Sequence, residues 1–130
     1  MKYLGVDLGF KHVGLALADG PLATPLPSFT HHSIPATVAN LADLATSHGV
    51  GTIVLGLPEG PVASLVQSVS EGLLSTGSYA VVLHDETLST QDAVLALRAS
   101  GANKRKLQND HSYAACLILE DYLETVSTST

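Results

Sequence analysis

Residues 51–58, GTIVLGLP, form a continuous apolar run that ends in Gly-Leu-Pro and contains no charged side chain. Such a run is typical of a β-strand buried on both faces, and a strand of this kind requires helices on each side of its sheet. Apolar residues recur at helical spacing on both flanks of the run. Before it these residues are Val38, Leu41, Ala42 and Ala45, and after it they are Leu65, Val66, Val69 and Leu73. The chain is therefore predicted to be an α/β protein.

The first third of the chain has the pattern of antiparallel strands. We predict strands over Tyr3–Leu8 and Val13–Ala18, because Val, Leu and Tyr favour extended backbone. The connection Gly9–His12 suits a hairpin in which Gly9 supplies unusual backbone angles. A third strand is placed over Ser28–Ile34, after a stretch that contains several prolines.

Helices and strands alternate in the remainder. The first helix opens with Pro35 and stops at Gly49, since proline suits a first turn and glycine a C-terminal cap. The later predicted elements are a helix that ends at Thr76-Gly77, a strand over Tyr79–His84, a helix from Ser89 or Thr90 to Arg98, and a last helix from about Gln108 to Glu124. Right-handed crossovers in this half predict parallel strands beside the antiparallel first half, which is a mixed sheet with helices on its faces.

Length and composition favour a single domain. The 130 residues, of which 45% are hydrophobic, suffice for one buried core, so we expect a domain over residues 1–125 and a frayed tail over 126–130. No leader pattern and no apolar run of the roughly 20 residues that cross a bilayer are visible, and a cytoplasmic protein without membrane contact is expected. Cys116 is the single cysteine, which excludes an internal disulfide, and its apolar neighbours predict a packed core thiol.

Acidic residues occur at positions that suggest a metal site. Asp7 interrupts an apolar strand, where a carboxylate is costly unless a cation or a donor meets it. Asp85-Glu86 follows a predicted parallel strand, and the carboxyl ends of such strands gather functional residues, so Asp7 and Glu86 are expected to be close. Clustered carboxylates repel one another unless they share a cation, and Mg²⁺ or Mn²⁺ would suit phosphodiester hydrolysis. The alternatives are a solvated turn at Asp85-Glu86 and a helix N-cap at Asp110.

Four motifs follow one another along residues 1–124: GVDLGFKHVGLALAD, TIVLGLP, DETLSTQDA and DHSYAACLILEDYL. Together they resemble the YqgF/RuvX family of RuvC-like nucleases, which have the ribonuclease H fold. The resemblance implies a five-stranded sheet in the order 3-2-1-4-5, flanked by helices, with an acidic divalent-metal site at its centre. It also implies maturation of the small-subunit (16S) ribosomal RNA precursor, with Holliday-junction cleavage as the alternative.

The resemblance assigns two carboxylates and exposes two departures from the family pattern. Asp7 matches the first carboxylate of the family, and Glu86 matches the second, in a motif usually written Asp-Glu-Arg. Thr87 stands in place of that arginine, and His12 stands in place of an arginine in the first hairpin. Lys11 can substitute only in part, because a lysine cannot make a bidentate contact to phosphate.

The third site residue is either His111 or Asp110. The family motif places an aspartate three residues before a pair of alanines, and counting back from Ala114-Ala115 leads to His111. Neighbouring helix positions point about 100° apart, so Asp110 cannot occupy the same place. His111 shares a helix face with the alanines and is predicted to be a metal ligand or a water-orienting group, with Asp110 in support. A purely structural histidine is the alternative.

These residues predict a metal-dependent endonuclease that acts on RNA. Asp7, Glu86 and His111 or Asp110 would hold Mg²⁺ or Mn²⁺ and activate water for attack on phosphorus. The basic side chains assigned to phosphate contact are Lys11, His12, Arg98, Lys104, Arg105 and Lys106. For the last three of them a solvated loop is the alternative.

Other functions remain open at this point. The net charge of −6 disfavours general attraction to nucleic acid, which together with His12 and Thr87 favours an inactive descendant that only binds nucleic acid or protein. Branched DNA is the alternative substrate, and both monomer and homodimer are compatible with the sequence. An actin-like or sugar-kinase-like ATPase begins with a similar hairpin, but it needs a second domain, and phosphate-loop and dinucleotide motifs are absent from the sequence.

Overall fold

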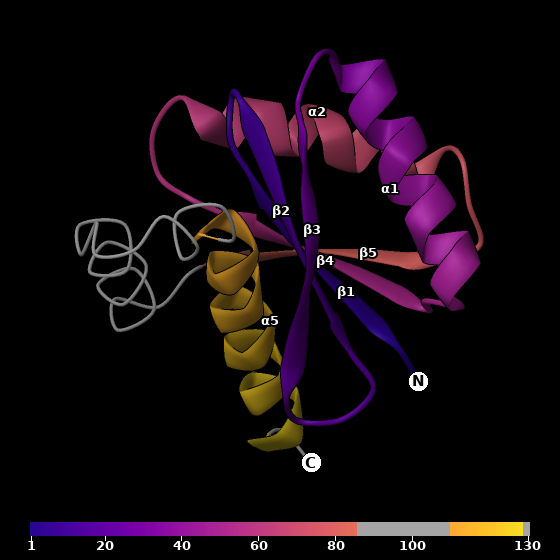
Figure 1. The fold of residues 1–130 in the computed structure, drawn as a ribbon, viewed down its shortest axis with the longest axis vertical. Coiled ribbons are helices and arrows are strands. Elements are labelled where there is room, and N and C mark those ends of the chain that lie inside the picture. Colours follow the sequence, from indigo (N-terminus) through magenta and orange to yellow (C-terminus); the bar gives the residue numbers. More distant parts are fainter. Residues whose placement is uncertain (86–109, 129–130) are drawn as a thin grey trace.

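The computed structural model describes residues 1–85 and 110–128, with only the backbone described at Asp110, Ser127 and Thr128. It contains a five-stranded sheet in the order β3-β2-β1-β4-β5, with α1 and α2 on one side and α5 on the other (Figure 1). The elements are β1 (Tyr3–Leu8), β2 (His12–Ala18), β3 (Ala23–Thr30), α1 (Ile34–His48), β4 (Thr52–Leu57), α2 (Val62–Leu74), β5 (Ala80–Asp85) and α5 (Asp110–Thr128). The predicted mixed sheet and its strand order are confirmed. The helix predicted from Ser89 or Thr90 to Arg98 lies outside the described residues.

Strand pairing follows the predicted division of the chain. Strand β1 pairs with β2 in antiparallel and with β4 in parallel, and β4 pairs with β5 in parallel. The apolar run is therefore a central strand, and every residue of β4 except Leu57 is buried. This burial on both faces explains why the run lacks the alternation of a half-exposed strand.

The sheet separates two hydrophobic cores of unequal size. On the side of α1 and α2, large side chains from alternate strand positions, such as Leu4, Val6 and Leu55, pack against both helices. On the opposite side α5 packs against small residues. The buried members of that second core are Ala16, Ala18, Val54, Ala115, Cys116 and Leu119. Cys116 is buried, as predicted.

Strand β3 occupies Ala23–Thr30 and not the predicted Ser28–Ile34. The prediction was wrong because it treated Pro25 and Pro27 as strand breakers. Strand β3 is an edge strand, and proline is tolerated on an edge because the missing N–H can face away from the neighbouring strand. Ser33 instead caps α1, since its hydroxyl oxygen accepts a hydrogen bond from the Ala36 N–H at 3.2 Å.

The predicted role of Gly9 is also wrong. Among the described residues, φ lies in the left-handed region at Gly49 (67°) and Gly60 (95°), and not at Gly9. In the hairpin the Gly9 N–H donates a hydrogen bond to the His12 carbonyl oxygen at 2.9 Å, and a Cβ at Gly9 would lie 3.2 Å from that oxygen. Glycine at position 9 therefore allows the His12 carbonyl oxygen to come close to the backbone of the turn. Gly49 is the C-terminal cap of α1, as predicted.

Two element boundaries differ from the prediction towards the C-terminus. Strand β5 includes Asp85, which pairs with Leu57 and does not follow the strand. Helix α5 continues to Thr128, beyond the predicted end at Glu124. The Thr125 hydroxyl supports this last part by donating to the Tyr122 carbonyl oxygen at 2.6 Å. None of the described helices has the length and apolar character needed to cross a membrane.

Candidate active site

Asp7 lies on the face of β1 that is turned towards α5. Its register partner on β2 is Gly14, and the preceding residue on the same face is Gly5. A Cβ at Gly5 would lie 2.7 Å from the Leu119 Cβ, so α5 sits nearly in contact with the sheet backbone. The Asp7 side chain is half-buried and does not belong to either hydrophobic core. The neighbouring glycines thus let α5 approach the sheet closely, while the Asp7 carboxylate itself lines a pocket.

The first turn of α5 is held against β2 at Gly14. A Cβ at Gly14 would overlap the carbonyl group of His111, so no larger residue fits at this crossing. The register of β2 against β3 shifts between Val13 and Leu15, which marks a bulge at the same place. This contact sets the position of His111 relative to Asp7.

Ser112 fastens the same turn to two strands. Its hydroxyl donates to the Leu26 carbonyl oxygen at 2.6 Å and accepts from the Leu15 N–H at 3.3 Å. The side chain is fully buried, and it joins β2 and β3 beside the irregular register. A buried hydroxyl that satisfies a donor and an acceptor at a bulge resists displacement, because its loss would leave both backbone groups unpaired.

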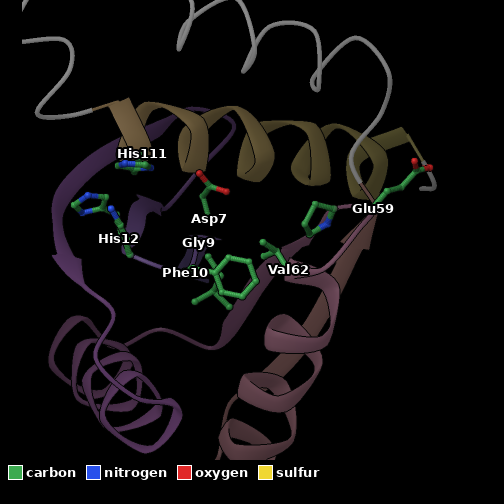
Figure 2. Close-up of a pocket in the computed structure, with 10 residues that line it drawn as sticks. Asp7, Gly9, Phe10, His12, Glu59, Val62 and His111 are labelled. Atoms are coloured by element: carbon green, nitrogen blue, oxygen red, sulfur yellow. The ribbon is translucent and has the colours of Figure 1, made fainter.

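His111 stacks on His12. The two imidazole rings have centroids 4.7 Å apart and planes inclined by 27°. Figure 2 shows this pair on one side of a pocket, with the Asp7 carboxylate pointing into the space next to His111. Two histidines from opposite ends of the chain therefore form one wall beside the carboxylate.

The pocket encloses about 560 Å³ at the carboxyl ends of β1 and β4. It is lined by Asp7, Leu8, Gly9, Phe10, Lys11, His12, Pro58, Glu59, Val62 and His111. Ligands bind in α/β sheets at this edge, outside the carboxyl ends of the strands. In register at the same edge, Asp85 of β5 pairs with Leu57 of β4.

The structure brings four of the predicted site residues to this pocket. They are Asp7, Lys11, His12 and His111. Asp110 is the first residue of α5, but its side chain is not described. The other predicted residues, Glu86, Arg98, Lys104, Arg105 and Lys106, lie outside the described part of the chain.

The described donors fit part of a metal site. Asp7 offers carboxylate oxygens and His111 offers an imidazole nitrogen in the same pocket. Within residues 1–85 and 110–128, no three His, Cys, Asp or Glu side chains lie close enough together to hold an ion. The predicted third donor, Glu86, is not among these residues.

Gly14 and Ser112 are site residues that the sequence reasoning missed. Gly14 belongs to VGLALA, in which small residues alternate with large ones along β2. That alternation could have shown that one strand face is reserved for close helix packing. No comparable sequence signal marks Ser112, whose partners are 86 and 97 positions away along the chain.

Comparison with known proteins shows the family of the chain. The family described as "RuvX: Holliday junction resolvase" matches residues 1–125. The chain belongs to the RuvX family. A RuvX relative from Anaeromyxobacter sp. (strain Fw109-5), named "Putative pre-16S rRNA nuclease", is 38% identical over 95% of this chain and 97% of its own length. A relative of the same name from Chloroflexus aggregans is 32% identical over 93% of this chain and 92% of its own.

Solved structures share the fold. RuvC of Thermus thermophilus in complex with a Holliday junction substrate superposes with a TM-score of 0.69 at 14% identity, covering 100% of this chain and 97% of that one. The fowlpox virus Holliday junction resolvase gives a TM-score of 0.58 at 13% identity, covering 97% of this chain and 99% of the viral one. These likenesses identify the RuvC-like ribonuclease H fold. The family match and the RuvX relatives, and not these fold likenesses, identify the chain as a nuclease.

Proposed function

We propose that this RuvX chain is a divalent-metal-dependent endonuclease that cleaves a precursor of small-subunit ribosomal RNA in the cytoplasm. The observation that carries the proposal is the meeting of Asp7 and His111 in one pocket at the carboxyl ends of β1 and β4. The names of the relatives support the choice of substrate.

Asp7, Glu86 and His111 are the proposed metal ligands, with Asp110 in support. A bound divalent ion would supply Lewis-acid activation of water and would neutralise charge on the phosphate. Mn²⁺ accepts nitrogen as well as oxygen donors, whereas Mg²⁺ favours oxygen. A set that includes the His111 imidazole therefore suits Mn²⁺ at least as well as Mg²⁺.

The protein's own cations would hold the substrate. Lys11 and His12 line the pocket beside Asp7 and can contact the phosphates next to the scissile one. Because the chain carries 6 Lys and Arg against 12 Asp and Glu, binding depends on local contacts more than on net attraction. Arg98 and the cluster 104–106 are proposed as further phosphate contacts.

A cleavage assay tests the proposal. End-labelled single-stranded RNA and structured, precursor-like RNA are incubated with Mn²⁺ or Mg²⁺ and with wild type, Asp7→Asn, His111→Ala or EDTA. We expect cleavage that EDTA abolishes and that Asp7→Asn lowers by about 100-fold or more, since a metal site contributes several kcal/mol to such a reaction. Asp43→Asn, at an exposed position of α1, makes the same charge change away from the pocket and should cleave like wild type.

The same assay separates the alternative functions. Four-way DNA junctions run in parallel distinguish a resolvase from an RNA nuclease. If neither wild type nor Asp7→Asn cleaves any substrate with any ion, the proposal of an enzyme is overturned. The chain would then be a binding module in which Asp7 is a remnant of a catalytic site.

A further inference from the structure

We propose that Phe10 forms a subsite for an unpaired nucleobase beside the cleavage centre, so that the chain selects single-stranded over duplex RNA. The inference deepens the proposed nuclease function and rests on it for the identity of the substrate. It concerns a side chain that neither the metal site nor the phosphate contacts use.

Phe10 is an exposed aromatic residue at the candidate active site. Its side chain is 60% exposed at the turn between β1 and β2, and it belongs to neither hydrophobic core. Single exposed apolar residues are common on protein surfaces, so the exposure alone carries nothing. The decisive fact is that this ring lines the same pocket as Asp7 and His111.

The turn that presents Phe10 is anchored on both sides. The Gly9 N–H donates to the His12 carbonyl oxygen at 2.9 Å, and the His31 N–H donates to the Lys11 carbonyl oxygen at 2.8 Å. The first bond closes the turn itself, and the second ties the turn to the residue that follows β3. A ring presented from a held turn loses less conformational entropy when it binds a flat partner.

The two sides of the pocket differ in chemistry. Phe10, Val62, Leu8 and Pro58 give the pocket its apolar lining, and the Glu59 side chain lies beyond Val62 in Figure 2. The stacked His12 and His111 lie on the other side, with Asp7 close to them. One side therefore suits the face of a base, and the other suits a phosphate.

A nucleotide has both of these parts. Lys11 follows Phe10 on the turn and lines the same pocket, so it can bind a phosphate while the ring stacks on the adjoining base. A base inside a duplex is covered on both faces by its neighbours, whereas an unpaired base can turn onto an aromatic side chain. The arrangement consequently favours single strands, with little preference for base identity.

Binding of short RNAs to the Asp7→Asn protein, which keeps the strand intact, tests the subsite by fluorescence anisotropy. Compared with the Asp7→Asn protein that keeps Phe10, the additional substitutions Phe10→Ala and Phe10→Leu should weaken single-strand binding by about 5- to 100-fold. The aromatic substitution Phe10→Trp should leave single-strand binding at the level of the protein with Phe10. Duplex binding should change little in all three. Leu22→Ala is the matched control, because Leu22 is 76% exposed at a turn outside this pocket.

A second arm uses single strands with one abasic nucleotide at successive positions. With Phe10 present, one position should weaken binding by the same factor as Phe10→Ala, and in Phe10→Ala that position should no longer matter. The abasic effect itself is measured with Phe10 in place, so it does not depend on whether a Phe10 variant folds.

Several outcomes would overturn the subsite. They are wild-type-like binding by Phe10→Leu, equal losses on duplex and single strand, no sensitive abasic position, or no measurable binding of single strands. These results are independent of the cleavage assay, since an inactive chain can stack a base and an active one can lack the subsite.

Discussion

The charge of Asp7 is compatible with its strand because the side chain is only half-buried and lines a pocket. Gly14 beside it in the register and Gly5 on the same face let α5 approach the sheet closely without covering the carboxylate. Desolvation is thereby only partial, which suits a group that must hold a cation. The His12 ring stacks on that of His111, and the two ring centroids lie 4.7 Å apart.

Cys116 gives a prediction about pH. Burial raises the pKa of its thiol from 9.0 to about 11, and the nearby Glu120 carboxylate adds to this shift. The folded protein therefore keeps the thiol proton up to a higher pH than the unfolded chain does. The stability from this group is complete below about pH 9 and is lost as pH rises towards 11.

Urea unfolding at pH 8 and at pH 10.5 measures this effect. Between the two pH values, the free energy of unfolding of wild type should fall further than that of Cys116→Ala. The pKa of Tyr122 is also raised, by burial and by Tyr3, but Tyr122 is present in both proteins and its contribution cancels. Equal falls in the two proteins would contradict the prediction.

Helix α5 carries His111, one of the two described donors of the proposed metal site, and its position depends on its crossing with β2. The carbonyl group of His111 occupies the space that a side chain at Gly14 would need, and Ser112 bridges β2 and β3 one residue further on. Backbone cannot move aside as the end of a flexible side chain can. The position of His111 thus follows from a contact between backbones.

Replacing Gly14 should disrupt this crossing. Gly14→Ala is expected to lower the free energy of unfolding by about 3 kcal/mol, since overpacking typically costs 1–3 kcal/mol and here the obstacle is backbone. It should also lower cleavage, because His111 is displaced with the helix. Gly20→Ala is the control: nothing lies within 4 Å of a Cβ there, so a change within about 0.5 kcal/mol is expected. Chemical denaturation and the cleavage assay together check both effects, and equal stability of the two variants would refute the packing argument.

The number of basic side chains in the entire chain limits how steeply its affinity for RNA can depend on salt. Six Lys and Arg residues set an upper limit on ion release, and at about 0.7 per phosphate contact the slope of log K against log salt cannot be steeper than about −4. The limit counts the Lys and Arg side chains alone.

Lys11 should account for one phosphate contact's share of that salt dependence, about 0.7 in the slope. It lines the pocket, whereas Lys2 precedes the opposite end of β1. In a titration of salt against single-strand affinity, Lys11→Ala is expected to make the slope shallower by about 0.7, and Lys2→Ala to leave it unchanged. Equal effects of the two variants would show that phosphates are bound elsewhere on the molecule, and a wild-type slope steeper than about −4 would show that groups other than Lys and Arg contribute.

Much of the architecture was predictable because it rests on short-range patterns. The apolar run at 51–58, the helical spacing around Leu41 and Val69, and the cap at Gly49 each reflect the periodicity or backbone freedom of a few neighbouring residues. Strand β3 was misplaced because tolerance of Pro25 depends on the edge position, which is a property of the sheet.

The amino-acid order alone establishes the succession of strands and helices, the family, and the presence of a carboxylate inside the first strand. Tertiary structure alone decides that His12 stacks on His111, that Gly14 admits the helix, and that the Ser112 hydroxyl meets the Leu15 N–H from 97 positions away. The physical reason is the separation along the chain between the residues that interact. Secondary structure follows from interactions among adjacent residues, whereas this site joins the first hairpin to the last helix, and only the packing of the folded sheet brings them together.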